Sequence, residues 1–270
     1  PKMPDALDDP RAQANLLILE IGNYHVSVAA CVGGSIRTDK RFGLDQADDV
    51  VAYCEEACSA LPEDHRRALA AASVVPDALD RLRERIQESL NDELMVVSVP
   101  LPLPMPLAVA APGLVGIGAA CAAAAAYDGV RGPCAVASFG TAITIDCVNG
   151  EGVFMGGAIL PGLRLQAAAL HEGTAALPEV EVEATGTVFG ASTREAICNG
   201  ILFGVVGGLR EIVERYATHL GSWPFLIATG GAAEMVGKEC DFIDRTVPDL
   251  CLRGIALAYR KHFTPLPESW

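Results

Sequence analysis

Three glycine turns, each following an apolar run rich in β-branched residues, are the segments of this sequence best suited to chemistry. The turns are Gly22-Asn23, Gly140-Thr141 and Thr229-Gly230-Gly231. A glycine where a strand ends lets backbone N–H groups approach an anion closely, because no side chain stands in the way. Three such turns favour a nucleotide site, with phosphate held between two α/β halves of the chain.

A repeated order of elements would position these turns. Strands are expected at residues 16–21, 25–32, 35–42, 69–75, 95–99, 134–137, 143–148, 152–159 and 225–228. Helices are expected at residues 46–61, 76–90, 116–127, 164–170, 193–216, 234–236 and 252–262, the first of them with Asp45 as its cap. A β-meander followed by helix, strand, helix and strand occurs twice. This order predicts an α/β protein of two ribonuclease-H-like domains in tandem, the acetate/sugar kinase and actin-type ATPase fold.

The expected division of the chain follows from that repeat. A loose, proline-containing arm is expected at residues 1–14, an N-terminal ribonuclease-H-like domain at 15–112 and a C-terminal one at 113–270. The boundary between the two domains falls at the end of a proline-rich connector, a composition typical of linkers.

Charge and composition exclude several classes of partner. Lys and Arg total 20 against 34 Asp and Glu, a formal net charge of −14, so neither nucleic acid nor an anionic membrane surface is an expected partner. The most continuous apolar stretch, residues 97–114, contains five prolines, so no membrane span is expected. The sequence does not open with a basic segment followed by an apolar one, as a signal peptide would, so export is not expected. Nine cysteines, an odd number lying mostly in apolar segments, predict reduced thiols in a cytoplasmic protein.

Seven segments, in order and at matching spacing, resemble the motifs of type III pantothenate kinases from about Leu16 to Tyr259. They lie at residues 20–24, 72–76, 116–119, 138–141, 156–162, 190–193 and 229–231. The Gly-Gly-Ala-Ile-Leu-Pro-Gly segment at 156–162 and the Ser-Phe-Gly-Thr segment at 138–141 are the most specific of them. The resemblance implies phosphoryl transfer from ATP, with Mg²⁺, to the terminal hydroxyl of pantothenate, the first step towards coenzyme A. It also implies a homodimer and a monovalent-cation site.

The resemblance assigns roles to individual positions. It implies that the nucleotide and its phosphates are bound by Glu20, Gly22, Asn23, Gly140, Thr141, Thr229, Gly230 and Gly231. It implies that the pantothenate pocket is lined by Val109, Gly116, Gly118, Ala119, Gly157 and Thr193.

This sequence departs from the family pattern where the chemistry is concentrated. The aspartate that serves the family as base and the arginine that binds pantothenate correspond to Gly118 and Ala119. The aspartate that binds the monovalent cation corresponds to Ser138, so that site is expected to be lost, and Tyr24 stands where the family has Thr or Ser. Loss of a general base alone lowers the rate by ~10²–10⁴. An impaired or inactive kinase is therefore expected, with Glu20 as a possible substitute base.

Other interpretations remain open at this point. Asp146 is a second candidate base, although a buried carboxyl supporting its strand is equally consistent with its position. The chain could be a pseudoenzyme that binds a nucleotide or ligand, or that forms a hybrid dimer with a paralogous kinase subunit. It could also phosphorylate another acceptor in a remade pocket. His171-Glu172 and Arg164 follow the Pro161-Gly162 loop and are candidates for ligand contact, and Thr193 would serve equally as a helix cap.

Overall fold

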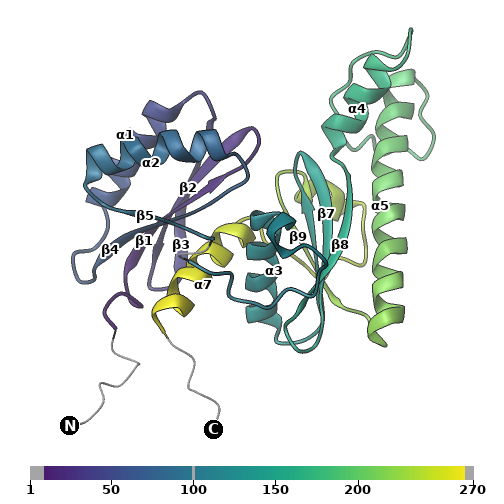
Figure 1. Ribbon diagram of the computed structural model, residues 1–270. Coiled ribbons are helices and arrows are strands. Elements are labelled where there is room, and N and C mark those ends of the chain that lie inside the picture. Colours follow the sequence, from purple (N-terminus) through teal and green to yellow (C-terminus); the bar gives the residue numbers. More distant parts are fainter. Residues whose placement is uncertain (1–8, 99–100, 265–270) are drawn as a thin grey trace. The chain divides into compact units, whose positions relative to one another are not determined.

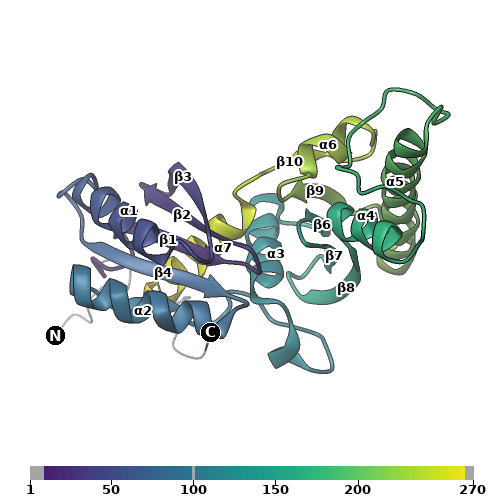
Figure 2. The ribbon, with the colours of Figure 1, turned by 90° about the horizontal axis from the view of Figure 1, so that it is seen from above.

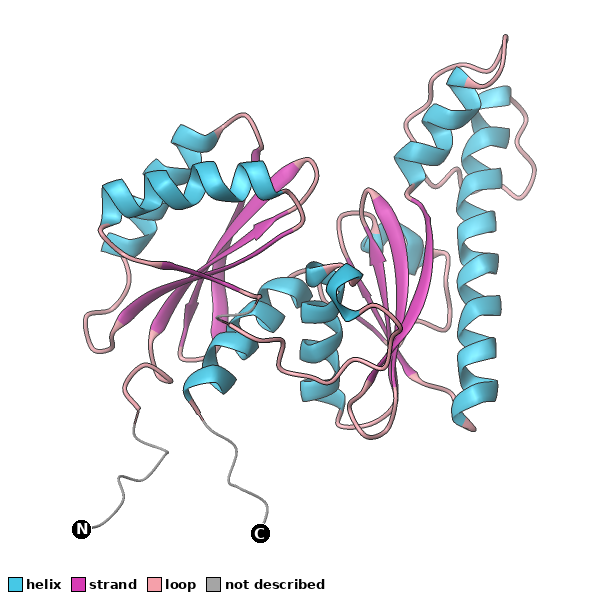
Figure 3. Cartoon of the chain, in the orientation of Figure 1, coloured by secondary structure: helices cyan, strands magenta, loops and turns pink. Residues whose placement is uncertain are grey.

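The computed structural model describes residues 9–98 and 101–264, and its helices and strands are shown in Figures 1 and 3. The chain forms two compact units. The first takes the described residues within 1–106, 113–125 and 250–270, and the second takes residues 107–112 and 126–249. The sequence predicted a single boundary at residue 112, which would place residues 113–125 and 250–270 in the second domain. In the structure both segments belong to the first unit.

The expected N-terminal arm lies in part outside the described residues, which begin at residue 9. Residues 9–14 form turns, with the N–H of Ala12 donating to the carbonyl of Asp9 at 2.9 Å. Arg11 forms an ion pair with Asp9 at 2.7 Å, and its guanidinium lies 4.4 Å from the ring centroid of Phe263. These contacts tie the chain to the first unit shortly before its first strand begins.

The first unit contains a five-stranded sheet in the order β3-β2-β1-β4-β5. Its strands are β1 (Asn15–Ile21), β2 (His25–Val32), β3 (Ser35–Gly43), β4 (Arg67–Ser73) and β5 (Leu94–Val96). β1 and β2 are antiparallel, whereas β1 pairs with β4, and β4 with β5, in parallel. The expected meander is confirmed, and the strand expected at 69–75 forms as β4, which pairs in parallel with β1.

Alternation along β1 directs its side chains to two different layers. Leu17, Leu19 and Ile21 belong to the core beneath α1 (Ala47–Ser59) and α2 (Pro76–Leu90). The residues between them, Glu20 among them, point to the opposite face because successive strand residues alternate. There α7 (Leu250–Phe263) contacts β1 and β4, and Figure 1 shows α7 on the side of the sheet away from α1 and α2.

The second unit repeats the topology of the first. Its strands are β6 (Cys134–Phe139), β7 (Ala142–Val148), β8 (Phe154–Pro161), β9 (Phe225–Thr229) and β10 (Arg245–Thr246), in the order β10-β9-β6-β7-β8. Counted from the β8 edge, this is the order of the first sheet, and β6 is likewise antiparallel to β7 and parallel to β9. The chain therefore has two ribonuclease-H-like sheets, as the repeated order of elements predicted.

Three helices accompany the second sheet, namely α4 (Leu163–Glu172), α5 (Thr193–Leu220) and α6 (Ala233–Lys238). α4 and α5 lie side by side, as Figures 1 and 2 show. The hydroxyl of Tyr216 in α5 donates to the carbonyl of Ile145 in β7 at 2.8 Å. Among the described helices α5 alone is long and apolar enough to cross a bilayer by length and composition, and 44% of its most apolar window is buried within the protein.

A close helix–helix contact completes the first unit. α3 (Ile117–Val130) begins in this unit, and its residues 120–124 are buried alanines apart from Cys121. A Cβ atom on Gly254 of α7 would lie 1.9 Å from the carbonyl oxygen of Cys121, so only glycine permits this approach. Small side chains on α3 and a glycine on α7 thus bring the two backbones together.

The start of α1 differs from expectation, whereas α2 forms as expected. α1 begins after Gln46, so the expected cap at Asp45 was wrong. The side chain of Gln46 does not cap the helix, because its oxygen accepts a hydrogen bond from the N–H of Gly43 at 2.7 Å. α2 runs from Pro76 to Leu90 as expected, because proline suits the first helical turn and Asn91 ends the helix in the left-handed region at φ 53°.

Candidate functional site

The candidate residues fall into two groups, one in each unit. In the first unit, the carboxyl ends of the parallel strands β1 and β4 lie next to each other, with Glu20 opposite Ala72 and Ile21 opposite Ser73. The N–H of Gly22 donates to the carbonyl of His25 at 2.9 Å and closes the turn after β1. Ligands of α/β folds bind at this end of parallel strands.

Glu20 is the acidic side chain of this group, and it faces the start of α3. A Cβ atom on Gly118 would lie 3.7 Å from Oε1 of Glu20 and 3.6 Å from Sγ of Cys251. Burial raises the pKa of Glu20, and a hydrogen bond with the Cys251 thiol and the positive charge of Arg41 act against that rise. Cys251 was expected only as a core thiol, because no local pattern indicated that α7 would bring it to Glu20.

A small cavity opens beside the Glu20 carboxyl. Its volume is about 30 Å³, and it is lined by Glu20, Ile21, Gly22, Ala72, Ser73, Val74, Ile117 and Gly118. A volume of this size holds one water molecule or one hydroxyl group. Gly116 and Ala119 lie at the same helix start, where a Cβ on Gly116 would be 4.0 Å from that of Ala119. The structure therefore brings Glu20, Gly22, Gly116, Gly118 and Ala119 to one region.

Tyr24 lies in the turn after β1, where its side chain is 45% exposed. Asn23, beside it, is also exposed. A large ring on this turn leaves less open space beside it than a small hydroxyl side chain would.

In the second unit, the two remaining glycine turns meet at the ends of adjacent parallel strands. Ser138 of β6 pairs with Thr229 of β9, so Gly230 follows beside Phe139, the residue before Gly140. Gly230 has φ +93°, and a Cβ there would lie 2.6 Å from the carbonyl oxygen of Phe139. Both the backbone conformation and the close approach require glycine.

The loop after β8 closes on the first of these turns. A Cβ on Gly162 would lie 2.3 Å from the carbonyl oxygens of both Gly140 and Thr141. The hydroxyl of Thr229 is directed elsewhere, because this residue is buried and its Oγ1 donates to the carbonyl of Pro248 at 3.4 Å. The side chain of Thr229 is therefore engaged within the second unit.

The donor set of the second unit fits a nucleotide's phosphates. Backbone N–H groups in glycine turns at the ends of parallel strands are neutral donors that can surround anionic oxygens. The N–H of Gly140 already donates to the carbonyl of Ala142 at 3.1 Å, so phosphate contacts would come from the other N–H groups of these turns. Among the described residues no group of three or more His, Cys, Asp or Glu side chains could hold a metal ion. Mg²⁺ needs no such group when it is bound mainly by substrate phosphates and water.

Asp146 lies in the second unit with two of the expected pocket positions. Its carboxyl is buried, Thr144 Oγ1 donates to its Oδ2 at 2.8 Å, and burial raises its pKa to about 6. A Cβ on Gly157 would lie 2.8 Å from Oδ1 of Asp146, so glycine is needed beside this carboxyl. Val109 lies next to Gly156, where a Cβ would be 3.5 Å from its Cγ1.

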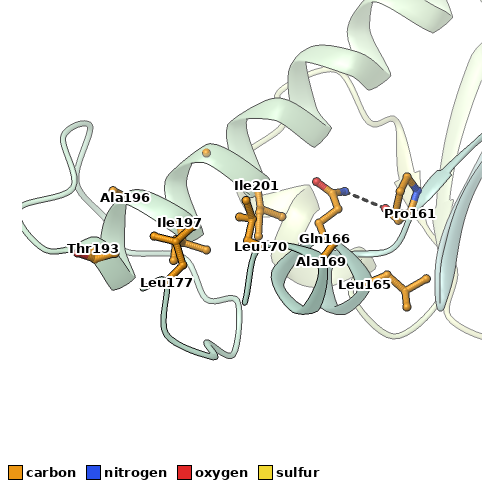
Figure 4. Close-up of a pocket in the computed structure, with 11 residues that line it drawn as sticks. Pro161, Leu165, Gln166, Ala169, Leu170, Leu177, Thr193, Ala196, Ile197 and Ile201 are labelled. Atoms are coloured by element: carbon orange, nitrogen blue, oxygen red, sulfur yellow. Dashed lines mark hydrogen bonds between the residues drawn. The ribbon is translucent and has the colours of Figure 1, made fainter. Parts of the chain in front are cut away.

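Thr193 lies in an apolar groove between α4 and α5 (Figure 4). The groove has a volume of about 640 Å³ and is lined by Pro161, Leu165, Gln166, Ala169, Leu170, Leu177, Thr193, Ala196, Ile197, Gly200 and Ile201. Gln166 Nε2 donates to the carbonyl of Pro161 at 2.8 Å. The cap of α5 is Ser192, whose side chain accepts from the N–H of Glu195, so the alternative that Thr193 is the cap was wrong.

The remaining polar candidates lie on α4. The ring Nδ1 of His171 is 2.8 Å from the carbonyl oxygen of Leu177, a contact within the loop that follows the helix. Arg164 is exposed in the first turn of α4. His171 is therefore engaged by its own loop rather than directed at the glycine turns.

Comparison with known proteins identifies relatives along nearly the whole chain. The model of the type III pantothenate kinase family matches residues 16–215. A type III pantothenate kinase of Rhodospirillum rubrum is 33% identical over 253 residues, covering 92% of this chain and 98% of the relative. One from Frankia alni is 32% identical over 251 residues, covering 92% and 99%.

Solved structures show the same fold at low sequence identity. A Baf family protein from Campylobacter jejuni superposes with a TM-score of 0.60 at 18% identity, covering 91% of this chain and 98% of the other. Component A of the (R)-2-hydroxyglutaryl-CoA dehydratase of Acidaminococcus fermentans gives a TM-score of 0.55 at 12% identity, covering 93% and 100%. These likenesses are evidence for the fold alone.

Proposed function

This chain belongs to the type III pantothenate kinase family, and we propose that it is an ATP-dependent phosphotransferase whose turnover of pantothenate is strongly reduced. The observation that supports this most is the start of α3, where Gly118 and Ala119 contribute neither a carboxylate nor a guanidinium. Phosphoryl transfer depends on positioning the acceptor hydroxyl and on neutralising charge. A helix start without these groups binds and orients an anionic acceptor poorly.

The nucleotide side supports retention of ATP binding. The turns at Gly140 and Gly230 follow adjacent parallel strands, and the positive φ and close backbone contact at Gly230 require glycine there. These turns would hold the phosphates, with Mg²⁺ entering on the nucleotide. Ser138 carries no charge, so the proposal includes loss of the monovalent-cation site of the family.

The assay of purified protein with Mg-ATP and pantothenate tests this proposal. The reference is the triple variant Glu20→Asp/Gly118→Asp/Ala119→Arg, which restores the family residues at these positions. Turnover by the unmodified chain is expected to be at least ~10²-fold lower than that of the reference, the usual effect of losing a general base. Equal turnover by the two proteins would contradict a reduced activity.

A second candidate is a non-catalytic homologue that binds nucleotide or ligand, or that pairs with a paralogous kinase subunit. The exposed ring of Tyr24 in the turn after β1 favours it, because that turn would otherwise face phosphate. A melting temperature raised by Mg-ATP without any turnover would support this candidate, through the linkage of binding to stability. Turnover of another hydroxyl compound, but not of pantothenate, would support a kinase for a different acceptor.

A homodimer in the cytoplasm is part of the proposal. The groove between α4 and α5 leaves apolar side chains in contact with solvent, including Leu165, which is 38% exposed. Exposed apolar surface of this kind marks interaction sites. The oligomeric state in solution tests this part independently of activity.

A further inference from the structure

We propose that Glu20 accepts the proton of the acceptor hydroxyl, acting through the space that Gly118 leaves open at the start of α3. This inference deepens the proposed function and rests on it. It assigns the reduced turnover proposed for this chain to one carboxyl group on β1.

The geometry around Glu20 carries the inference. Its Oε1 lies 3.7 Å from the place of a Cβ on Gly118, so no side chain separates the carboxyl from the helix start. The adjoining cavity of about 30 Å³ is large enough for one hydroxyl group. A general base must lie within hydrogen-bond reach of the proton that it takes, and a hydroxyl in this cavity meets that condition.

Cys251 positions the carboxyl. Burial and the neighbouring negative charge raise the pKa of the Cys251 thiol well above its usual range, so the thiol keeps its proton and donates it to Glu20 in a hydrogen bond. The contact comes from α7, whose close packing on α3 through Gly254 fixes the position of Cys251. The hydrogen bond from Cys251 thus fixes the position of the Glu20 carboxyl group.

The glycine turn directly after Glu20 places phosphate chemistry nearby. Gly22 and Asn23 follow within three residues, and Gly22 lines the same cavity. During transfer the acceptor oxygen forms a bond to the γ-phosphorus while the bond from that phosphorus to the departing nucleoside diphosphate breaks. The hydroxyl proton passes to the Glu20 carboxylate and from there to solvent, so charge and atoms balance.

Asp146 was the other candidate base, and its surroundings favour it less. Thr144 donates to its Oδ2, and its Oδ1 lies 2.8 Å from the place that a Cβ on Gly157 would take. Both carboxyl oxygens therefore face the protein's own strands. Glu20, in contrast, borders a cavity.

Four proteins test the inference, namely the unmodified chain, Glu20→Gln, Gly118→Asp and Glu20→Gln/Gly118→Asp. Glu20→Gln keeps the size of the side chain, and its turnover is expected to fall by ~10²-fold or more. The ATP-dependent rise in melting temperature is expected to persist, because the carboxyl acts on the acceptor. Adding Gly118→Asp to Glu20→Gln is expected to recover at least ~10-fold, because the new carboxylate would enter the same space.

A stability measurement gives a readout separate from activity. Gly118→Asp is expected to lower the melting temperature more in the unmodified chain than in the Glu20→Gln background, because two carboxylates would then stand within a few ångströms. Gly118→Ala is the matched control, since its Cβ makes only ordinary contacts with Glu20 and Cys251. Equal effects of Gly118→Asp in both backgrounds would show that the two positions do not share this space.

The outcomes separate the inference from the proposed function. An active unmodified chain with an equally active Glu20→Gln variant overturns the inference and leaves the proposed function standing. Loss of the ATP-dependent melting shift in Glu20→Gln also overturns it, because the side chain would then act on the nucleotide. An unmodified chain without turnover overturns the proposed function, and the inference with it.

Discussion

Gly254 of α7 lies against the carbonyl group of Cys121 in α3, so closely that a Cβ atom would stand 1.9 Å from the carbonyl oxygen. This contact joins a helix from the middle of the sequence to one near its end. It also holds Cys251, one turn earlier in α7, beside Glu20.

Replacement of Gly254 by alanine is expected to destabilise the protein. The helical propensity of alanine favours the change by up to ~1 kcal/mol, but overpacking against a backbone atom costs ~1–3 kcal/mol or more. The steric effect is expected to prevail because the carbonyl group cannot move without shifting α3. Urea unfolding measures the difference in free energy.

Gly129→Ala is the matched control for this prediction. Gly129 lies in α3, and a Cβ there would meet no heavy atom within 4 Å. This variant is expected to be unchanged or slightly more stable, in line with helix propensity. Equal stability of the Gly254→Ala variant and the unmodified chain would mean that the two helices do not pack this closely.

Asp146 is expected to make stability fall as the pH rises from about 4 to 6. Its folded pKa is raised to about 6 from the usual 3.8, so in this range the folded protein holds a proton that the unfolded chain has released. The slope of unfolding free energy against pH is therefore negative over this range and vanishes outside it. Burial of the charged form costs about 3 kcal/mol at neutral pH on this basis.

Asp146→Asn removes this titration and tests the predicted sign of the slope of unfolding free energy against pH. Asparagine can still accept the hydrogen bond from Thr144, so the variant is expected to gain stability relative to the unmodified chain at pH 7 but not at pH 4. Urea unfolding at both pH values gives the difference. A constant difference across that range would show that Asp146 does not titrate there.

The cysteine thiols are expected to resist alkylation while the protein is folded. All nine are buried, and burial raises the pKa of Cys54, Cys121 and Cys134 to about 12 in each case. The thiolate is the reactive form, so reaction with iodoacetamide at pH 8 is expected to be slow. Mass spectrometry before and after addition of denaturant counts the labelled sites, and rapid labelling of any of these three in the folded protein would contradict the prediction.

Leu165→Asp is expected to weaken self-association. The residue lines the α4–α5 groove and is partly exposed, so a charge there opposes burial against a second copy without disturbing the core. Light scattering over a range of concentrations measures the change in mass. Val74→Asp, at an exposed apolar residue of the first unit, is the control that should leave the mass unchanged. A monomeric unmodified chain would rule out the dimer.

Much of the fold could be predicted because its signals are local. Strand β1 is marked by a continuous apolar run that ends at a glycine turn, and helix α2 begins at Pro76; both form where the sequence predicted them. β10 has only Arg245 and Thr246, too few residues for any periodicity, and was missed. Its position depends on pairing with β9, which no local pattern encodes.

The candidate site could be predicted only in part. The glycine turns were found because close backbone approach requires glycine, and Gly230 and Gly162 make such approaches. The proximity of Glu20, Gly118 and Cys251 joins three distant parts of the sequence, so it depends on tertiary packing and not on spacing. The family resemblance placed Thr193 in the pantothenate pocket, whereas the structure places it in the groove between α4 and α5.

The first unit is built from segments at opposite ends of the sequence, since α7 covers the sheet that β1 begins. During synthesis on a ribosome, β1 and β4 emerge long before α7, and the apolar face that α7 covers must wait for it. The second unit has all its strands and helices α4 to α6 between residues 126 and 249, and it can be complete while the first is still open. The nascent chain therefore exposes a sheet face that chaperones of newly made proteins would recognise, until residue 263 has left the exit tunnel.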